Sequence, residues 1–150
     1  MVSDDQFDSW YGKAIYWVLV IIGVGLMTAF IPIFFPVSLM AWIHGILGLG
    51  EFPDRPITAY LARSTSLMYG IHGTLIFVAT FDLKRYWPLV PVFGWLHIAT
   101  GLTILGVDLS APMPWYWIAG EGIPVASGGV LILWLYQKAN QVNGPDVREW

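Results

Sequence analysis

The chain contains no cysteine, and only 11% of its 150 residues are charged. The missing cysteine excludes a disulfide framework, thiol chemistry and a Cys-ligated metal site. A typical soluble domain carries about 25% charged residues, so the shortage of charge argues against a soluble protein. Lysine and arginine total seven against ten acidic residues, and no basic patch marks a nucleic-acid-binding surface. No nucleic-acid partner is expected.

Hydrophobic residues make up 57% of the chain, which has a mean hydropathy of +0.64. They gather in four long apolar stretches, at 14–35, 57–81, 89–107 and 122–137. Each stretch is near the length of about 20 residues that a helix needs to cross the hydrocarbon core of a bilayer. The sequence therefore predicts an all-α integral membrane four-helix bundle in a single transmembrane domain, followed by a polar tail at 138–150.

The connections between these stretches differ in character. Pro32 and Pro36 are expected to end or bend the first span, because proline cannot continue the backbone hydrogen bonds of a helix. The apolar segment 37–48 is too short to cross the bilayer, so it is predicted to form a short helix at the outer interface or a re-entrant segment. We expect a tight turn at 82–88 and a loop rich in proline and aromatic residues at 108–117.

Lysine and arginine predict the orientation, because short cytoplasmic loops collect these residues. With both termini in the cytoplasm, most of them fall on the inner side: Lys13, Lys84, Arg85, Lys138 and Arg148. Only Arg55 and Arg63 then fall on the outer side. This bias predicts a multi-pass protein of the bacterial inner membrane with two cytoplasmic termini.

Three ionisable residues near span ends form the first candidate site, namely Arg63, Asp108 and Glu121. Adjacent spans alternate in direction, so all three reach the same outer level. We expect Arg63 to contact Asp108, Glu121 or both, because a guanidinium binds a carboxylate best as a bidentate fork. The cluster either clamps three helices together or floors a pocket for the head group of a small amphipathic molecule. The side chains expected to roof such a pocket are Met113, Trp115 and Trp117.

Histidines form the second candidate site. His72 and His97 lie near the middles of the second and third stretches, where they could be axial ligands of haem b or could line a quinone site. The plainer interpretation is that each histidine forms a hydrogen bond to a neighbouring helix. His44 lies in the short interfacial segment, and its role stays open. No third ligand is visible at the same depth, so zinc is not expected.

Glycines within the stretches are expected to let helices approach closely, as small residues do in membranes. They are Gly70, Gly73, Gly94, Gly101, Gly128 and Gly129. No phosphate-binding loop, nucleophile elbow or metalloprotease motif occurs in the sequence, so nothing nominates a nucleophile. The chain is therefore expected to be non-catalytic.

Several strings fall in an order and spacing that resembles a known group. They are Tyr60-Leu-Ala-Arg-Ser64, Arg85-Tyr-Trp-Pro-Leu89, Gly106-Val-Asp-Leu-Ser-Ala-Pro-Met-Pro-Trp-Tyr-Trp117 and Glu121-Gly122. The pattern is similar to the BphX-like group of small four-helix bacterial membrane proteins, over roughly residues 57–137. The resemblance implies a four-helix membrane fold and brings no settled activity. The positions that it singles out are Arg63, Asp108, Met113, Pro114, Trp115 and Glu121.

Three functions from different classes follow, of which a transporter or channel has the least support, because four short spans without a continuous polar stripe offer no path unless the protein oligomerises. The first is a non-catalytic membrane protein that binds a small lipid-like or aromatic molecule, or serves as an accessory subunit of a membrane assembly. The alternative is a redox membrane protein that holds haem b or quinone between the second and third helices. The expected partners are the lipid bilayer and either other membrane subunits or further copies of the chain.

Overall fold

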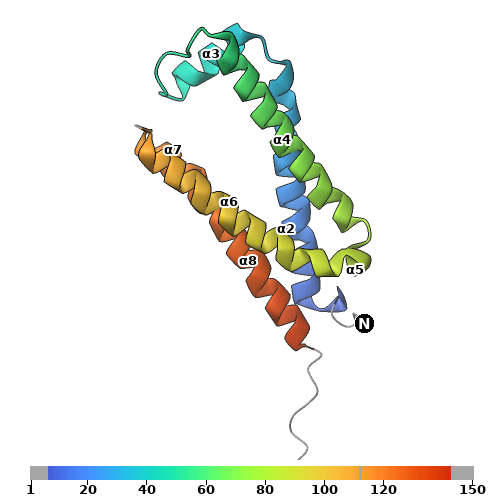
Figure 1. Cartoon of the computed structure of the whole chain (residues 1–150). Coiled ribbons are helices and arrows are strands. Elements are labelled where there is room, and N and C mark those ends of the chain that lie inside the picture. The colour runs from blue at the N-terminus through green and yellow to red at the C-terminus, as the bar shows by residue number, and fades with distance from the viewer. Residues whose placement is uncertain (1–6, 112, 143–150) are drawn as a thin grey trace, which may run out of the picture. The chain divides into compact units, whose positions relative to one another are not determined.

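The computed structural model describes residues 7–111 and 113–142, and every regular element in these ranges is a helix (Figure 1). The predicted all-α fold is thereby confirmed. In chain order the elements are α2 (Trp10–Met27), η1 (Thr28–Phe34), α3 (Val37–Ile46), α4 (Pro56–Thr80), α5 (Leu83–Tyr86), η2 (Trp87–Leu89), α6 (Val90–Ser110), α7 (Trp115–Gly120) and α8 (Gly122–Gln141).

Three helical segments in the described residues are long and apolar enough to cross a membrane, namely Trp10–Phe34, Leu83–Ser110 and Trp115–Gln141. They correspond to the predicted spans at 14–35, 89–107 and 122–137. The remaining predicted span, 57–81, is the 25-residue helix α4. This helix does not reach the same apolar content, because residues such as Arg63 and His72 interrupt it. A fourth span therefore stays a prediction.

Proline decides how the first span ends. The α-helix α2 stops at Met27, and the chain continues as the 3₁₀-helix η1, which contains Pro32. An α-helical Pro32 would lack its hydrogen bond and would clash with the carbonyl of the preceding turn, so the chain tightens instead. At Phe35 the backbone becomes extended, with a ψ of 135°, and Pro36 caps the next helix. The predicted effect of both prolines is confirmed.

The short apolar segment after Pro36 forms the ten-residue helix α3, as the sequence predicts. The turn after it depends on two glycines, because Gly48 and Gly50 have positive φ angles of 67° and 88°. His44 stabilises this turn. Its Nδ1 lies 3.1 Å from the carbonyl oxygen of Gly50, and its ring meets the edge of Phe52 at 5.5 Å between centroids.

Two connections are more helical than the sequence predicts. The expected tight turn at 82–88 contains α5 and η2, where the Asp82 side chain accepts a hydrogen bond from the backbone N–H of Arg85 and so caps α5. Within the expected loop at 108–117, α6 continues to Ser110 and α7 starts at Trp115.

The fourth span also extends beyond 137 to Gln141, and residues 143–150 of the expected polar tail lie outside the described residues.

The chain divides into two compact units. The described parts of Met1–Val20 and Ala79–Trp150 form the first unit, which is here called the α6–α8 unit. Ile21–Val78 forms the second, here called the α3–α4 unit. Helix α2 begins in the first and ends in the second.

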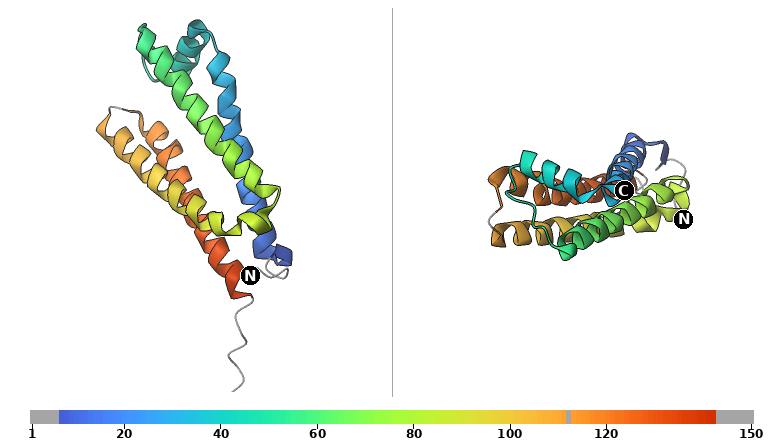
Figure 2. Two further views of the ribbon diagram at one scale, coloured as in Figure 1. Left: turned by 45° about the vertical axis from the view of Figure 1, so that its right-hand side comes forward. Right: turned by 90° about the horizontal axis from the view of Figure 1, so that it is seen from above.

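Pairs of glycines let α6 and α8 pack closely within the α6–α8 unit. A methyl group added to Gly101 would lie 2.6 Å from the carbonyl oxygen of Gly122, and one added to Gly129 would lie 2.5 Å from that of Gly94. The pairing of 94 with 129 and of 101 with 122 makes the two helices antiparallel and side by side (Figures 1 and 2). The predicted close approach of helices is confirmed at Gly94, Gly101 and Gly129, where only the absence of a side chain permits it.

Glycines also let helices pack closely in the α3–α4 unit. A methyl group added to Gly73 would lie 2.6 Å from the carbonyl oxygen of Gly23, on the C-terminal half of α2. One added to Gly70 would lie 2.6 Å from the Phe30 ring of η1. The antiparallel pair in this unit is therefore α4 against the end of α2 and η1.

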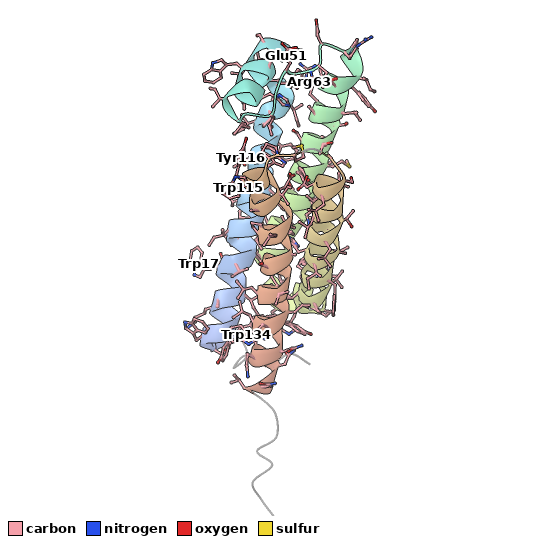
Figure 3. All side chains as sticks on the ribbon, turned by 90° about the vertical axis from the view of Figure 1, so that its left-hand side faces the viewer. Trp17, Glu51, Arg63, Trp115, Tyr116 and Trp134 are labelled. Carbon is pink, nitrogen blue, oxygen red and sulfur yellow. The ribbon has the colours of Figure 1, made fainter. Side chains whose placement is uncertain are left out.

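The outer faces of the apolar helices are uncovered. In an apolar 18-residue stretch of each candidate span, only 11%, 22% and 22% of the residues are buried, so most of the apolar side chains there need lipid or protein around them. Most tryptophans at span ends are exposed, and Trp17 projects away from the ribbon (Figure 3). Trp87 differs, because η2 buries it against Tyr136, with its indole N–H donating to Asn140 at 3.3 Å.

Candidate functional site

An open groove runs along one face of α4. Its α4 residues recur at the spacing of three and four that places side chains on one side of a helix. The groove has a volume of about 360 Å³ and is lined by Ile33, Pro56, Ala59, Tyr60, Arg63, Ser64 and Leu67. Ligand pockets are commonly about 300–1,000 Å³ and mainly apolar with a few polar groups, and this groove shares both properties.

Arg63 is the charged residue of the groove, and a local feature of the backbone fixes it. Its Nη2 donates a hydrogen bond of 3.0 Å to the carbonyl oxygen of Phe35. Phe35 lies at the end of η1, where helix carbonyls lack partners within the helix, and the amide of Leu39 bonds to Pro36 instead. The guanidinium therefore satisfies an orphaned carbonyl and is held at the edge of the groove.

Arg63 keeps donors for a ligand. Across Ile21–Val78, all of whose residues are described, Arg63 forms no ion pair with Glu51 or Asp54, the two carboxylates of this unit. Arg63 and Glu51 both lie toward the same end of the unit (Figure 3). A guanidinium has five N–H donors, so one bond to Phe35 leaves a fork for a phosphate or carboxylate.

Asp108, in the α6–α8 unit, is a buried charged residue, whereas Arg63 is exposed. It lies near the end of α6, on the face that carries Gly101, and only 6% of its surface is exposed. Its Oδ2 is fully buried and has no hydrogen-bond partner among the described residues. Because buried polar atoms are almost always satisfied, an orphaned carboxylate oxygen needs an explanation.

Glu121 lies beside Asp108. It is the residue that precedes α8, and its backbone N–H bonds to the carbonyl oxygen of Trp117 at 3.0 Å. The Trp117 indole donates a hydrogen bond to the Glu121 side chain, and the charges of Glu121 and Asp108 act on each other. The end of this unit thus gathers two carboxylates, of which one is half-exposed and the other is buried.

The predicted three-residue cluster divides between the units. Arg63 belongs to the α3–α4 unit, whereas Asp108 and Glu121 belong to the α6–α8 unit. The structure brings the two carboxylates together, and the contact of Arg63 with either of them stays a prediction. Of the expected roof, Met113 precedes α7, Trp115 on α7 is 79% exposed, and Trp117 binds Glu121.

The histidines of the redox hypothesis also divide between the units. His97 is buried in α6, and its Nδ1 lies 2.8 Å from the carbonyl oxygen of Phe93, one turn earlier in the same helix. His72 lies in α4 and is half-buried. His97 Nδ1 thus bonds within its own helix, and the expected bond from each histidine to a neighbouring helix stays a prediction. The shared haem or quinone site stays a prediction.

Among residues 7–111 and 113–142, no group of three or more histidine, aspartate or glutamate side chains is placed to hold a metal ion. Comparison of the chain with protein-family models, curated proteins and solved structures finds no match. The resemblance to the BphX-like group therefore stays a prediction.

Sequence reasoning found Arg63, Asp108 and Glu121 but missed the surroundings of Arg63. The spacing of Pro56, Ala59, Arg63 and Leu67 is a signal that predicts one shared face of α4. Nothing in the sequence indicates that Ile33 completes the groove, because that contact depends on how η1 packs against α4.

Proposed function

We propose that the chain is a non-catalytic protein of the bacterial inner membrane that binds a small amphipathic molecule through Arg63. The molecule is lipid-like or aromatic, and an anionic head group, phosphate or carboxylate, would meet the guanidinium. The observation that carries this proposal is the groove of about 360 Å³, in which one arginine stands among apolar side chains.

The charge of the groove determines which head group fits. Arg63 supplies planar donors suited to bidentate bonding with phosphate or carboxylate, and Ser64 adds a hydroxyl group. The Ser64 hydroxyl donates to the carbonyl oxygen of Leu61 at 3.1 Å, which leaves its oxygen lone pairs as acceptors. The apolar side chains Ile33 and Leu67 would then contact the hydrocarbon or aromatic part of the ligand.

The proposal includes four membrane spans, with α4 as the fourth. At 25 residues, α4 is about 37 Å long, which exceeds the hydrocarbon thickness of about 30 Å. Its close pairing with α2 through Gly73 and Gly23 gives its polar residues a neighbouring helix. The excess of lysine and arginine at Lys13, Lys84 and Arg85 supports cytoplasmic termini.

Binding of dodecyl phosphate to the purified chain in a neutral detergent tests the proposed ligand chemistry. Arg63→Gln should weaken binding by about 10–100-fold, because hydrogen bonds to a charged group contribute about 1.5–3 kcal/mol. Arg55→Gln is the matched control, since Arg55 is exposed, lies near the same helix start and does not line the groove. Equal losses in both variants, or no loss in Arg63→Gln, would contradict the proposal.

The absence of cysteine gives a clean test of orientation. The single variants Ser9→Cys and Ser110→Cys are expressed in bacteria, and the intact cells are treated with a membrane-impermeant maleimide. The two variants should differ in labelling. The proposal expects the reagent to label the cysteine at position 110 from outside and the cysteine at position 9 only after the cells are opened. Labelling of both from the same side would overturn the topology.

A further inference from the structure

We propose that Asp108 and Glu121 form a second ligand site, which accepts a primary ammonium group. The site lies within the α6–α8 unit and is independent of the Arg63 groove. Its anchor is the Asp108 Oδ2, which is buried and unpartnered among the described residues, on a side chain only 6% exposed. A cationic occupant would supply the missing hydrogen bond and the missing charge together.

The described helices that build this end of the unit place no lysine or arginine there. Helices α6 and α7 contain no lysine or arginine, and α8 contains only Lys138. Along α8, Lys138 lies about 25 Å from Glu121 at 1.5 Å per residue. Its ammonium group donates to the side chain of Gln141 at 3.3 Å, at the opposite end of the helix. Within the described helices α6, α7 and α8, no lysine or arginine therefore lies at the end that carries the two carboxylates.

The position of Asp108 is a consequence of the glycine packing. A methyl group added to Gly122 would lie 2.8 Å from the backbone nitrogen of Leu105, so α6 meets the start of α8 closely at this level. Asp108 follows Leu105 by three residues and therefore lies on nearly the same face of α6. Glu121 immediately precedes Gly122. At this level the two carboxylates are near enough for their charges to act on each other, and Asp108 is buried.

The chemistry of the surroundings favours an amine over a metal ion. Calcium takes six to eight oxygen ligands, whereas the described residues supply two carboxylates and no third acidic or histidine ligand. A primary ammonium group needs only two or three acceptors. The rings of Trp115 and Tyr116, on the adjacent α7, are exposed by 79% and 43% and offer faces for a cation.

Thermal unfolding of the full chain in neutral detergent, followed by circular dichroism at 222 nm, tests this proposal. Butylammonium chloride should raise Tm relative to sodium chloride at equal ionic strength, by about 3–6 °C at a tenfold excess over its Kd. Phosphatidylethanolamine in mixed micelles should act in the same way, and phosphatidylcholine should not, if the natural amine belongs to a lipid. A response to butylammonium but not to phosphatidylethanolamine indicates a free amine and supports the proposal equally.

Variants separate this site from the Arg63 groove. Asp108→Asn should abolish the response to butylammonium while dodecyl phosphate still binds. Glu51→Gln is the control, because Glu51 is an exposed carboxylate outside the unit, and it should respond as the unaltered chain does. An equal Tm rise in Asp108→Asn, or no rise in the unaltered chain, would overturn the proposal. A rise that appears only in Arg63→Gln would also overturn it, because Arg63 would then be the occupant.

Discussion

The two units of this chain use the same packing device and place their ionisable groups in opposite environments. Glycine brings α6 against α8 at Gly101 and brings α4 against α2 at Gly73. In the α3–α4 unit, the cation Arg63 is exposed, lines an open groove and bonds to the Phe35 carbonyl. In the α6–α8 unit, the anion Asp108 is buried with an unpartnered oxygen. Close packing therefore does not by itself determine whether a nearby charge is satisfied.

The substitution with the largest expected effect disrupts the close glycine contact between α6 and α8. Each unit contains a contact of this kind. Gly101→Ala would place a methyl group against Ala126 and 2.6 Å from the Gly122 carbonyl oxygen, and these backbone atoms cannot move aside. We expect a loss of about 3 kcal/mol in the free energy of unfolding, at the upper end for overpacked cores. Unfolding by sodium dodecyl sulfate in mixed micelles, followed by circular dichroism, measures this loss.

The same helix supplies the control for Gly101→Ala. Gly106 has no atom within 4 Å of an added methyl group, so Gly106→Ala should be neutral or should stabilise by about 0.5–1 kcal/mol through helix propensity. In the α3–α4 unit, Gly73→Ala and Gly25→Ala form the corresponding pair. Similar stabilities for Gly101→Ala and Gly106→Ala would show that the antiparallel α6–α8 contact is wrong.

Neutralising the two charges should change stability in opposite directions. Without ligand, Asp108→Asn should stabilise the chain by about 1 kcal/mol, because the buried Oδ2 has no hydrogen-bond partner among the described residues and a neutral amide costs less to bury than a carboxylate. Arg63→Gln should destabilise it by about 1 kcal/mol, because the hydrogen bond to Phe35 is lost. The same detergent unfolding assay measures both. If Asp108→Asn instead destabilises the chain, the Asp108 carboxylate already has a hydrogen-bond or cationic partner.

A double-mutant cycle tests whether the two charges pair with each other. If they act in separate sites, the stability changes of Arg63→Gln and Asp108→Asn should add to within about 0.5 kcal/mol. The ion pair predicted from the sequence instead requires a coupling energy well above that value. Strong coupling would support the ion pair and would remove the case for two ligand sites.

The smallest expected effect concerns the histidines. The chain purified in mild detergent and reduced with dithionite should show no sharp visible band of haem b, because binding of an amphipathic molecule requires no haem. His97→Gln should then leave the spectrum unchanged. A reduced band that disappears in His97→Gln would favour the redox hypothesis over the proposed function.

Local properties made much of the helical architecture predictable. The apolar runs predict helices at 14–35, 89–107 and 122–137, because backbone groups surrounded by apolar residues need internal hydrogen bonds. Pro32 and Pro36 predict the end of the first span for an equally local reason, the missing N–H of proline. The turn expected at 82–88 is wrong in part, since the side chain of Asp82 caps a short helix there.

The candidate site was predictable only as a set of residue types. The sequence identifies Arg63, Asp108 and Glu121 as unusual, because charges are rare near apolar helices. It also predicts that glycines allow close packing. It cannot say that Gly101 meets Gly122, or that η1 supplies a carbonyl oxygen to Arg63, because each contact joins residues distant in the chain.

The sequence alone determined that the chain is helical and apolar, since length, hydropathy and proline act through the local backbone. Tertiary structure decided the environment of each charge. Asp108 is buried near the level where glycines let α6 and α8 meet closely, and Arg63 is bonded because η1 ends with an unpartnered carbonyl beside α4. Burial and hydrogen bonding depend on which surfaces meet, and this is a property of the folded chain rather than of any segment within it.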